Sequence, residues 1–401
     1  MRNAGADRAR SRCRIDYAES ENSSTLLFMT GQKEIGLGII GFGGFALFAS
    51  QHFLQLPNVR LVGIAGSKRE EAATAAKRFG ATNFETIEEL LDAPGLDVVY
   101  VATPPFLHHP QSMMALRKGK HVICEKPLAV TAEQADEMIT FAREKGLLMV
   151  TNLMQRYNPM FERIQKLVQQ KLLGDFLHGY FENFASDEGL PVRHWFWDRE
   201  KSGGIFVEHG VHFFDVWEGW LGPGKVVASQ VCKRGNTGIE DQVNATVRYG
   251  ESTVNFYHGF TQPSRMDRQE TRLLFERGDV TLYEWVPTRM RLNAVADEAT
   301  TRALMDLFKG GRLDITTVYG GSDRAIRGRH KDFEANQKIQ ITAGFEDQKM
   351  HIYGELLRGM FRDQMQFLTS KTAPRKITEA NGHRSLLIAL EADRLAHLQG
   401  C

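Results

Sequence analysis

Residues 202–222 combine a long apolar run with side chains that could move a proton. Within this segment Glu208 and His212 lie four residues apart, and His212 and Asp215 lie three apart. On an α-helix these spacings place the three side chains on one face. A carboxylate beside an imidazole suits general acid–base chemistry near neutral pH, because the reference pKa of histidine is about 6.5. We interpret Asp215 as a structural residue that makes a hydrogen bond in the interior.

A metal site is the rival interpretation of this segment. Glu208, His209 and His212 are all residue types that bind metals. His209, however, lies about 100° around the helix from Glu208, and no other cluster of ligands stands out in the sequence. We therefore expect no metal, and we interpret His209 as a packed histidine.

A glycine-rich turn could bind a dinucleotide. The segment GFGGFA, residues 41–46, follows an apolar run and precedes an expected helix. Gly41 would form the tight turn, Gly43 would let the backbone approach a pyrophosphate, and Ala46 would let helix and strand pack closely. The N-terminus of the helix would then face the anion. In this setting the motif indicates an NAD or NADP site.

Strands and helices alternate from residue 34 to residue 152. Apolar runs typical of buried strands cover residues 34–43, 59–66, 97–103, 120–127 and 147–152. Helical patterns lie between them, at residues 45–54, 69–80, 108–119 and 131–146. This alternation predicts an α/β domain with a doubly wound parallel sheet, the Rossmann architecture.

The end of the second strand bears on the choice of cofactor. NAD sites usually carry Asp or Glu there, which bonds the ribose 2′-hydroxyl. Here the strand is followed by Ser67, Lys68 and Arg69, with no acid until Glu70. A small turn with two cations suits a 2′-phosphate, so we expect NADP in preference to NAD. Alternatively, Lys68 and Arg69 are solvated residues that open the next helix.

The fourth strand ends in the sequence CEKPLA, residues 124–129. Glu125 and Lys126 therefore lie at the carboxyl end of a parallel strand, where open α/β sheets bind ligands. A lysine ammonium there could polarise a carbonyl or hold an alkoxide. By themselves, these residues could equally form an ordinary loop.

Four segments, in this order, resemble the Gfo/Idh/MocA family of oxidoreductases. They are GFGGFA, VATPPFLHH, EKPLA and GGIFVEHGVHFFD, and the resemblance covers about residues 34–285. It implies an N-terminal Rossmann domain and a C-terminal α+β domain with an open, mainly antiparallel sheet. It also implies NAD(P)-dependent oxidation or reduction of sugars, polyols and related small molecules. Members often pair through the exposed face of that sheet, so we expect a homodimer or homotetramer.

The resemblance also assigns roles to particular residues. Lys126 matches a lysine that touches both the nicotinamide ribose and the substrate, and it would stabilise developing alkoxide charge. His212 matches the usual general acid or base. Glu208 stands where the family most often has aspartate, and it would orient His212 or bind a neighbouring hydroxyl. The expected cofactor-binding residues are Gly41, Phe42, Gly43, Gly44, Phe45, Ser67, Lys68, Arg69, Thr103, Pro104, His108, Glu125 and Lys126.

Residues 153–401 are expected to form the second domain. Alternation of apolar and polar residues predicts antiparallel strands up to about residue 285, and two amphipathic helices end the chain. Residues 286–345 are partly charged and aperiodic, so we interpret them as an insertion. Four side chains could bind a sugar, namely Arg156, Tyr157, Trp195 and Asp198. Alternatively, Trp195 and its neighbour Trp197 belong to the core.

The composition fits a globular protein without a strongly charged partner. The 401 residues carry a formal net charge of +1, so no strong field draws the chain to nucleic acid or to a membrane. The four cysteines are scattered, which favours a reducing compartment, and we expect the cytoplasm. No apolar run approaches the ~18 residues needed to cross a bilayer. The arginine-rich, polar residues 1–33 predict a disordered extension.

Together these features predict an oxidoreductase that transfers hydride between a nicotinamide cofactor and a secondary alcohol or carbonyl. The substrate would be a sugar, a cyclic polyol or a glycoside. One alternative is a catalytically silent relative that senses cofactor and sugar, although the intact Lys126 and His212 favour an active enzyme. Another is an enzyme of the same family that recycles NAD while it cleaves glycosides, which the sequence does not separate from a dehydrogenase.

Overall fold

The computed structural model describes residues 34–66, 69–345 and 349–398. The expected N-terminal extension, residues 1–33, lies outside this part of the chain. Among the helices of the described residues, none is both long enough and apolar enough to cross a membrane.

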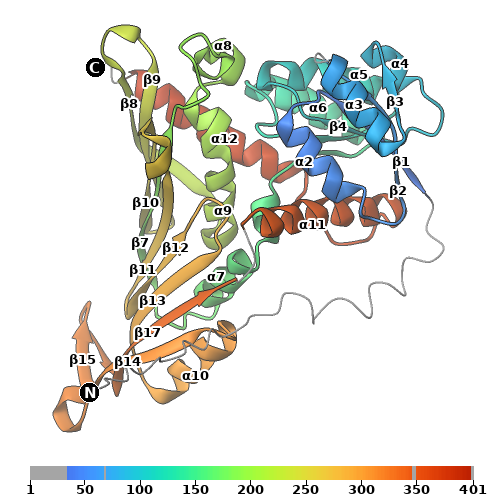
Figure 1. Ribbon diagram of the computed structural model, residues 1–401. Coiled ribbons are helices and arrows are strands. Elements are labelled where there is room, and N and C mark those ends of the chain that lie inside the picture. The colour runs from blue at the N-terminus through green and yellow to red at the C-terminus, as the bar shows by residue number, and fades with distance from the viewer. Residues whose placement is uncertain (1–33, 67–68, 346–348, 399–401) are drawn as a thin grey trace, which may run out of the picture.

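The first domain is a parallel sheet of six strands with helices on both faces (Figure 1). All neighbouring strands are parallel, and their order is β3-β2-β1-β4-β5-β6, as in the Rossmann fold. The strands are β1 (Ile35–Ile40), β2 (Val59–Ala65), β3 (Thr82–Phe84), β4 (Val98–Val101), β5 (His121–Cys124) and β6 (Met149–Thr151). The helices are α2 (Gly44–Phe53), α3 (Arg69–Phe79), α4 (Ile87–Leu91), α5 (His108–Arg117) and α6 (Ala132–Glu144).

Local sequence explains these elements. Every residue of β1 is buried, as expected for a central strand covered on both faces. Helix α6 begins where the Thr131 hydroxyl accepts a hydrogen bond from the Gln134 amide, the capping interaction that the sequence predicts. The short edge strand β3 has no apolar run and was not among the predicted strands, because three residues give too little periodicity to detect.

The second domain is built on an open sheet of nine strands. Only β7 and β10 pair in parallel; all other neighbours are antiparallel, as expected. The order is β14-β17-β13-β12-β11-β7-β10-β9-β8. The strands are β7 (Phe176–Ser186), β8 (Gly224–Lys233), β9 (Glu240–Tyr249), β10 (Ser252–Gln262), β11 (Arg268–Phe275), β12 (Gly278–Tyr283), β13 (Arg289–Ala296), β14 (Arg312–Val318) and β17 (Gln337–Gly344).

Helices lie between this sheet and the first domain (Figure 1). Trp217 of the helix α9 packs so closely on β7 that a Cβ on Gly179 would lie 2.3 Å from its ring. Side-chain packing against one face of the sheet therefore fixes α9. The helices of this half are α7 (Pro159–Gln169), α8 (Arg199–Ser202), α9 (Val211–Leu221), α10 (Glu298–Leu307), α11 (Lys349–Thr369) and α12 (Glu379–Leu398).

Two sequence-based interpretations of the C-terminal part need correction. Within residues 286–345, the strands β13, β14 and β17 extend the large sheet, so this range is not a separate insertion. Only the hairpin of β15 (Ala325–Gly328) and β16 (Lys331–Glu334) forms its own small sheet, which projects from the large one (Figure 1). Helix α11 was assigned to the second domain, yet it packs beside α2 of the first, where Phe361 stacks on Phe53 at 4.2 Å.

Candidate active site

The glycine-rich turn has the shape that a dinucleotide requires. Gly41 has a φ of +83°, and a Cβ there would lie 2.3 Å from Thr103 Cγ2. Among the described residues, nothing lies within 4 Å of the Cβ position of either Gly43 or Gly44. Helix α2 begins at Gly44 without a side-chain cap, so its first amides face this open space. The residues present therefore fit a phosphate group held at a helix N-terminus.

The loop after β4 is tied to the loop after β5 by a buried histidine. His108 places Nδ1 2.6 Å from the carbonyl oxygen of Pro127 and Nε2 2.7 Å from that of Thr103. Burial lowers the pKa of His108, and a neutral ring carries a single N–H that donates to one of the two oxygens. Thr103 and Pro104 follow the carboxyl end of β4, and His108 begins α5, which is consistent with the prediction that these residues lie near the cofactor.

Lys126 forms an ion pair across the two domains. Its Nζ donates to Glu208 Oε1 at 2.7 Å and to the Glu208 carbonyl oxygen at 2.8 Å. The two side chains are only 19% and 12% exposed. The sequence suggested that Glu208 would orient His212, whereas in the structure the Glu208 carboxylate bonds to Lys126. The pair holds an ammonium group at the carboxyl end of β5.

The segment that carries Glu208 and His212 is not one regular α-helix. Residues 206–210 form a π-helical turn that leads into α9 at Val211. Single π turns inside helices are frequent at functional sites. His212 is 6% exposed, and its Nδ1 has no hydrogen-bond partner among the described residues. Burial and the nearby Lys126 charge hold the pKa of His212 well below its usual range, so the ring is neutral at neutral pH.

His209 packs against a second histidine, as the sequence suggested for a structural residue. Its Nδ1 lies 3.1 Å from Nδ1 of His258 on β10, so one ring donates to the other. Burial lowers the pKa of His209 to about 3. Among the described residues, no group of three or more His, Cys, Asp or Glu side chains could hold a metal ion.

Glu125 faces the interior of the first domain. Its Oε1 accepts hydrogen bonds from the Tyr100 hydroxyl and, at 2.7 Å, from Asn152 Nδ2. Burial raises the pKa of this carboxyl group. Glu125 thus secures the strand end that carries Lys126, and the predicted contact of its side chain with the cofactor has no support in these contacts.

Arg156 and Tyr157 are engaged in structural contacts. Arg156 donates from Nε to Asp215 Oδ2 at 2.8 Å and from Nη2 to Asp215 Oδ1 at 2.8 Å, which is the interior bond expected for Asp215. The Tyr157 hydroxyl donates to Asp363. These contacts therefore give no support to the predicted role of Arg156 and Tyr157 in binding a sugar.

The segment before the π turn holds the remaining predicted residues. Asp198 caps α8 by accepting a hydrogen bond from the Glu200 amide and also pairs with Lys201. Trp195 is half-buried beside His194 and Phe196. Trp197 donates from its indole to the Leu190 carbonyl, as a core residue would. Ser67, Lys68 and the side chain of Arg69, expected to select NADP, lie outside the described residues.

Two models of known protein families match this chain. A model of an oxidoreductase family with an NAD-binding Rossmann fold matches residues 35–153. A model of the GFO/IDH/MocA C-terminal domain matches residues 161–281, so together the two cover more than half of the chain. The chain belongs to the Gfo/Idh/MocA family.

Curated members of the Gfo/Idh/MocA family are similar over part of their length. Glucose-6-phosphate 3-dehydrogenase of Bacillus subtilis is 29% identical over 53% of this chain and 60% of its own. The 1,5-anhydro-D-fructose reductase of Ensifer adhaerens is 32% identical over 49% and 61%. The NADP-dependent scyllo-inositol 2-dehydrogenase IolW of Bacillus subtilis is 28% identical over 59% and 66%. The chain thus spans about three-fifths of the length of these relatives.

Solved structures share the fold. Levoglucosan dehydrogenase in complex with NADH and L-sorbose has a TM-score of 0.72 at 20% identity, covering 92% of this chain and 98% of its own. Biliverdin reductase from Synechocystis, in complex with biliverdin and NADP+, has a TM-score of 0.66 at 19% identity, covering 90% and 98%. At these identities the likeness establishes the architecture of this family member and not its substrate.

Two aromatic residues near His212 were not predicted. Trp285, two residues beyond the end of β12, has its ring centroid 5.1 Å from that of His212. Tyr353 of α11 lies 5.4 Å from Trp285 and 5.9 Å from Phe45. Both lie beyond residue 281, where the family models end. No local pattern connects them to the glycine turn or to His212, so only the fold brings them together.

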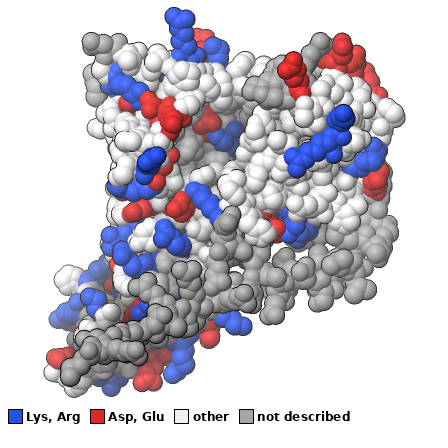
Figure 2. All heavy atoms as spheres, viewed as in Figure 1, with Lys and Arg blue, Asp and Glu red and all other residues white. Residues whose placement is uncertain are grey.

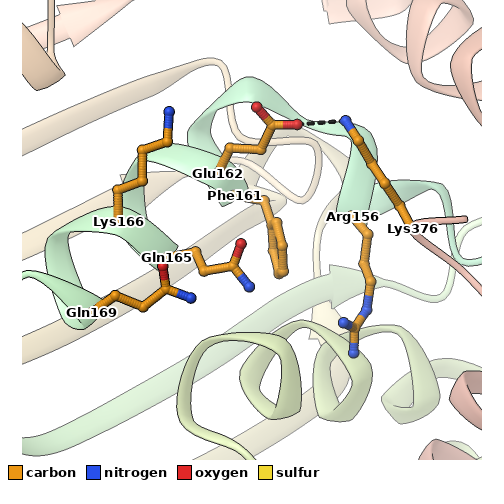
Figure 3. A pocket seen from close by; sticks show the side chains of 7 residues that line it. All are labelled: Arg156, Phe161, Glu162, Gln165, Lys166, Gln169 and Lys376. Carbon is orange, nitrogen blue, oxygen red and sulfur yellow. Dashed lines mark hydrogen bonds and ion pairs between the residues drawn. The ribbon is translucent and has the colours of Figure 1, made fainter. Parts of the chain in front are cut away.

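One hollow among the described residues is lined by neither Lys126 nor His212. It has a volume of about 290 Å³, between α7 and the segment that contains Lys376 (Figure 3). Most of its polar side chains are already engaged: Lys376 pairs with Glu162, and Gln165 donates to the Gly219 carbonyl. Charges of both signs are also interspersed over the face shown in Figure 2. Neither feature identifies a second ligand site.

Proposed function

We propose that this protein is an NAD(P)-dependent oxidoreductase that acts on a secondary alcohol or carbonyl of a sugar, cyclic polyol or glycoside. The observation that carries the proposal is the ion pair of Lys126 with Glu208, which brings the strand end of the first domain to the segment bearing His212. The names of its curated relatives, dehydrogenases and reductases of sugars and inositol, support this class of substrate.

The cofactor would be held by the turn from Gly41 to Phe45 and by the loop of Thr103, Pro104 and His108. The open space above Gly43 and Gly44 supports this placement. A bound nicotinamide supplies the hydride acceptor or donor. The protein residues then need to hold the substrate and to manage the hydroxyl proton and the charge on its oxygen.

Three residues would perform these tasks, namely His212, Lys126 and Glu208. His212 is neutral at working pH, so its imidazole can accept the hydroxyl proton of an alcohol or return it to a carbonyl oxygen. The Lys126 ammonium stabilises negative charge on that oxygen, and a fixed cation needs no rearrangement as the charge develops. Glu208 holds Lys126 in place through a charge-assisted hydrogen bond.

The test is turnover of variants on a panel of cyclic polyols, aldoses and glycosides. His212→Ala and Lys126→Ala should each lower turnover by about 10²–10⁴-fold, while His212→Ala keeps its cofactor affinity. Glu208→Asp should stay substantially active, and Glu208→Gln should be worse because Lys126 loses its counter-charge. His330→Ala, an exposed histidine on the projecting hairpin, is the matched control.

The panel also separates the alternative functions. Near-wild-type turnover in both alanine variants would move the chemistry away from these residues. Cofactor binding without turnover on any compound would favour the silent sensor. Glycoside cleavage with a tightly held cofactor and no net redox change would favour the NAD-recycling enzyme.

We further propose that NADP binds more tightly than NAD, on the sequence of residues 67–69. A 2′-phosphate would meet Ser67, Lys68 and Arg69 instead of a carboxylate. Titration should show a selective loss of NADP affinity in the Lys68→Ala, Arg69→Ala double variant. Tighter binding of NAD, with no effect of the double variant, would contradict the preference.

We also propose that the uncovered face of the large sheet pairs with a second copy of the chain. Val227 and Leu274 are 45% and 40% exposed, whereas the residue before each of them, Val226 and Leu273, is buried. They therefore point to the face opposite the helices. Light scattering of wild type and of a Val227→Glu, Leu274→Glu variant tests whether this face holds a dimer or tetramer.

A further inference from the structure

Trp285 lies between His212 on α9 and Tyr353 on α11. Its ring centroid lies 5.1 Å from that of His212 and 6.4 Å from that of Phe213, both on α9. On another side it meets Tyr353 edge-on at 5.4 Å. The indole is half-buried, whereas Trp217 and Trp220 on α9 are buried. Trp285 therefore combines proximity to His212 with a ring that keeps some access to solvent.

The backbone around Trp285 is held in an unusual conformation. Glu284, directly before it, has a φ of +78°, a left-handed conformation that is unfavourable for a residue with a Cβ. Contacts on both sides maintain it: the Glu284 carboxylate accepts a hydrogen bond from Lys349 at 2.8 Å, and Gln155 Nε2 donates to the Trp285 carbonyl. Such conformations persist where the surroundings impose them, and they cluster at functional sites.

Tyr353 extends the aromatic surface to the cofactor side. Its ring lies 5.9 Å from Phe45 and 5.2 Å from Phe48, both on α2. Phe45, Tyr353, Trp285 and His212 thus form a chain of rings from the glycine-rich helix start to the proposed acid–base residue. Both sides of the site contribute to this chain, and α11 supplies its centre.

We propose that Trp285, backed by Tyr353, is the platform on which the ring of a sugar or cyclitol substrate stacks beside His212. This deepens the proposed function and rests on it. A cyclic polyol has apolar C–H faces and a polar edge, so it requires a flat aromatic surface on one side and proton-transfer groups at the edge. Trp285 supplies the first and the neighbouring His212 supplies the second.

Trp195 is the rival platform suggested by the sequence. Its ring contacts only its own neighbours in the chain, His194 and Phe196, among the aromatic contacts of the described residues. Trp285, in contrast, meets the ring of His212 itself. Leucine substitutions at the two positions therefore discriminate between them.

The experiment compares Trp285→Leu, Trp285→Phe and Trp195→Leu on the best cyclic substrate of the panel and on an open-chain polyol, mannitol. Trp285→Leu should raise KM for the cyclic substrate by about tenfold or more, with a smaller change in kcat and unchanged NADP affinity. Trp285→Phe keeps an aromatic face and should stay within a few-fold of wild type. The preference for the cyclic over the open-chain compound should fall only in Trp285→Leu.

An unchanged KM in Trp285→Leu, or a larger rise in Trp195→Leu, would overturn the proposal. Turnover by the wild type tests the proposed function separately. If no compound is turned over, saturation-transfer NMR with myo-inositol still decides: the proposal requires transfer to the ring C–H protons that is lost in Trp285→Leu. Equal transfer in wild type and variant would overturn it.

Discussion

At the scale of single residues, burial decides the charge state of the ionisable groups around Lys126 and His212. His212 is neutral because a charged imidazole would lose its hydration there, and Lys126 adds a nearby positive charge. Glu125 and Lys126 are adjacent in the chain, yet one carboxyl group is enclosed by Tyr100 and Asn152 while the ammonium reaches across to Glu208. The peptide bond between them separates a contact inside the first domain from a contact between the two domains.

The lowered pKa of His212 predicts an unusual pH profile. A base is active in its neutral form, and a pKa well below 6.5 keeps His212 neutral as the pH falls through that value. We therefore expect kcat/KM for alcohol oxidation to show no decline near pH 6.5 and to fall only at lower pH. Initial rates between pH 5 and pH 8 test this. A decline centred on pH 6.5 that disappears in His212→Gln would contradict it.

The pair of Arg156 and Asp215 predicts an effect on stability. Asp215 is 1% exposed, so Arg156→Ala would leave a buried carboxylate without its two-point partner. Loss of one partner from a buried pair costs about 3–5 kcal/mol of unfolding free energy, measurable by urea denaturation. The double variant Arg156→Met, Asp215→Asn should recover much of that loss. A loss of unfolding free energy below about 1 kcal/mol would contradict the structural role of this pair and would make Arg156 a candidate substrate ligand again.

At the scale of elements, the glycine turn between β1 and α2 shows that two glycines of one motif meet different demands. Gly41 is required by the fold, because its φ of +83° and the contact with Thr103 leave no room for a side chain. Gly43 is not, because its Cβ position faces open space. The requirement for Gly41 in folding can therefore be tested separately from the requirement for Gly43 in ligand binding.

Alanine at each of these glycines should give different results. Gly41→Ala should lower the melting temperature, because a left-handed residue acquires a Cβ 2.3 Å from Thr103 Cγ2. Gly43→Ala should leave the melting temperature unchanged and still weaken NADP binding, because the added methyl group fills the space that the phosphates need. Thermal unfolding and cofactor titration check both. Equal cofactor affinity in Gly43→Ala and wild type would place the phosphates elsewhere.

At the scale of the whole molecule, helices that are far apart in the chain pack together. Helix α11 comes from the C-terminal part but packs on α2, where Phe361 stacks on Phe53 (Figure 1). The centre of the molecule also encloses histidines without compensating acids: His258 is fully buried, and its Nε2 has no hydrogen-bond partner among the described residues. Folding therefore requires these rings to be neutral.

This interior predicts sensitivity to acid. Burial holds the pKa of His212 and His258 well below 6.5, so below that pH the unfolded chain binds protons that the folded chain does not. Stability must then fall as the pH falls, by about 1.4 kcal/mol per pH unit for each group. His258→Phe should reduce the slope between pH 6 and pH 5 by about that amount, as urea denaturation would show. An unchanged slope would mean that His258 titrates normally in the folded protein.

The sequence by itself determined the fold class and supplied the candidate residues of the site. The glycine turn at 41–46, the alternating elements up to residue 152 and the EKP strand end are local patterns, because strand burial and tight turns depend on near neighbours. For the same reason Lys126, Glu208 and His212 could be selected by type and spacing. The family matches confirm the predicted family and fold.

Only the tertiary structure decided which of these groups meet. The bond from Lys126 to Glu208 joins residues 82 apart in the chain, and the contact of Trp285 with Tyr353 joins a strand end to a C-terminal helix. Arg156 resembled a substrate ligand in the sequence and proved to be the partner of Asp215. Such pairings depend on how the sheet and helices pack, and no local pattern records them, because a side chain's partner is set by three-dimensional distance.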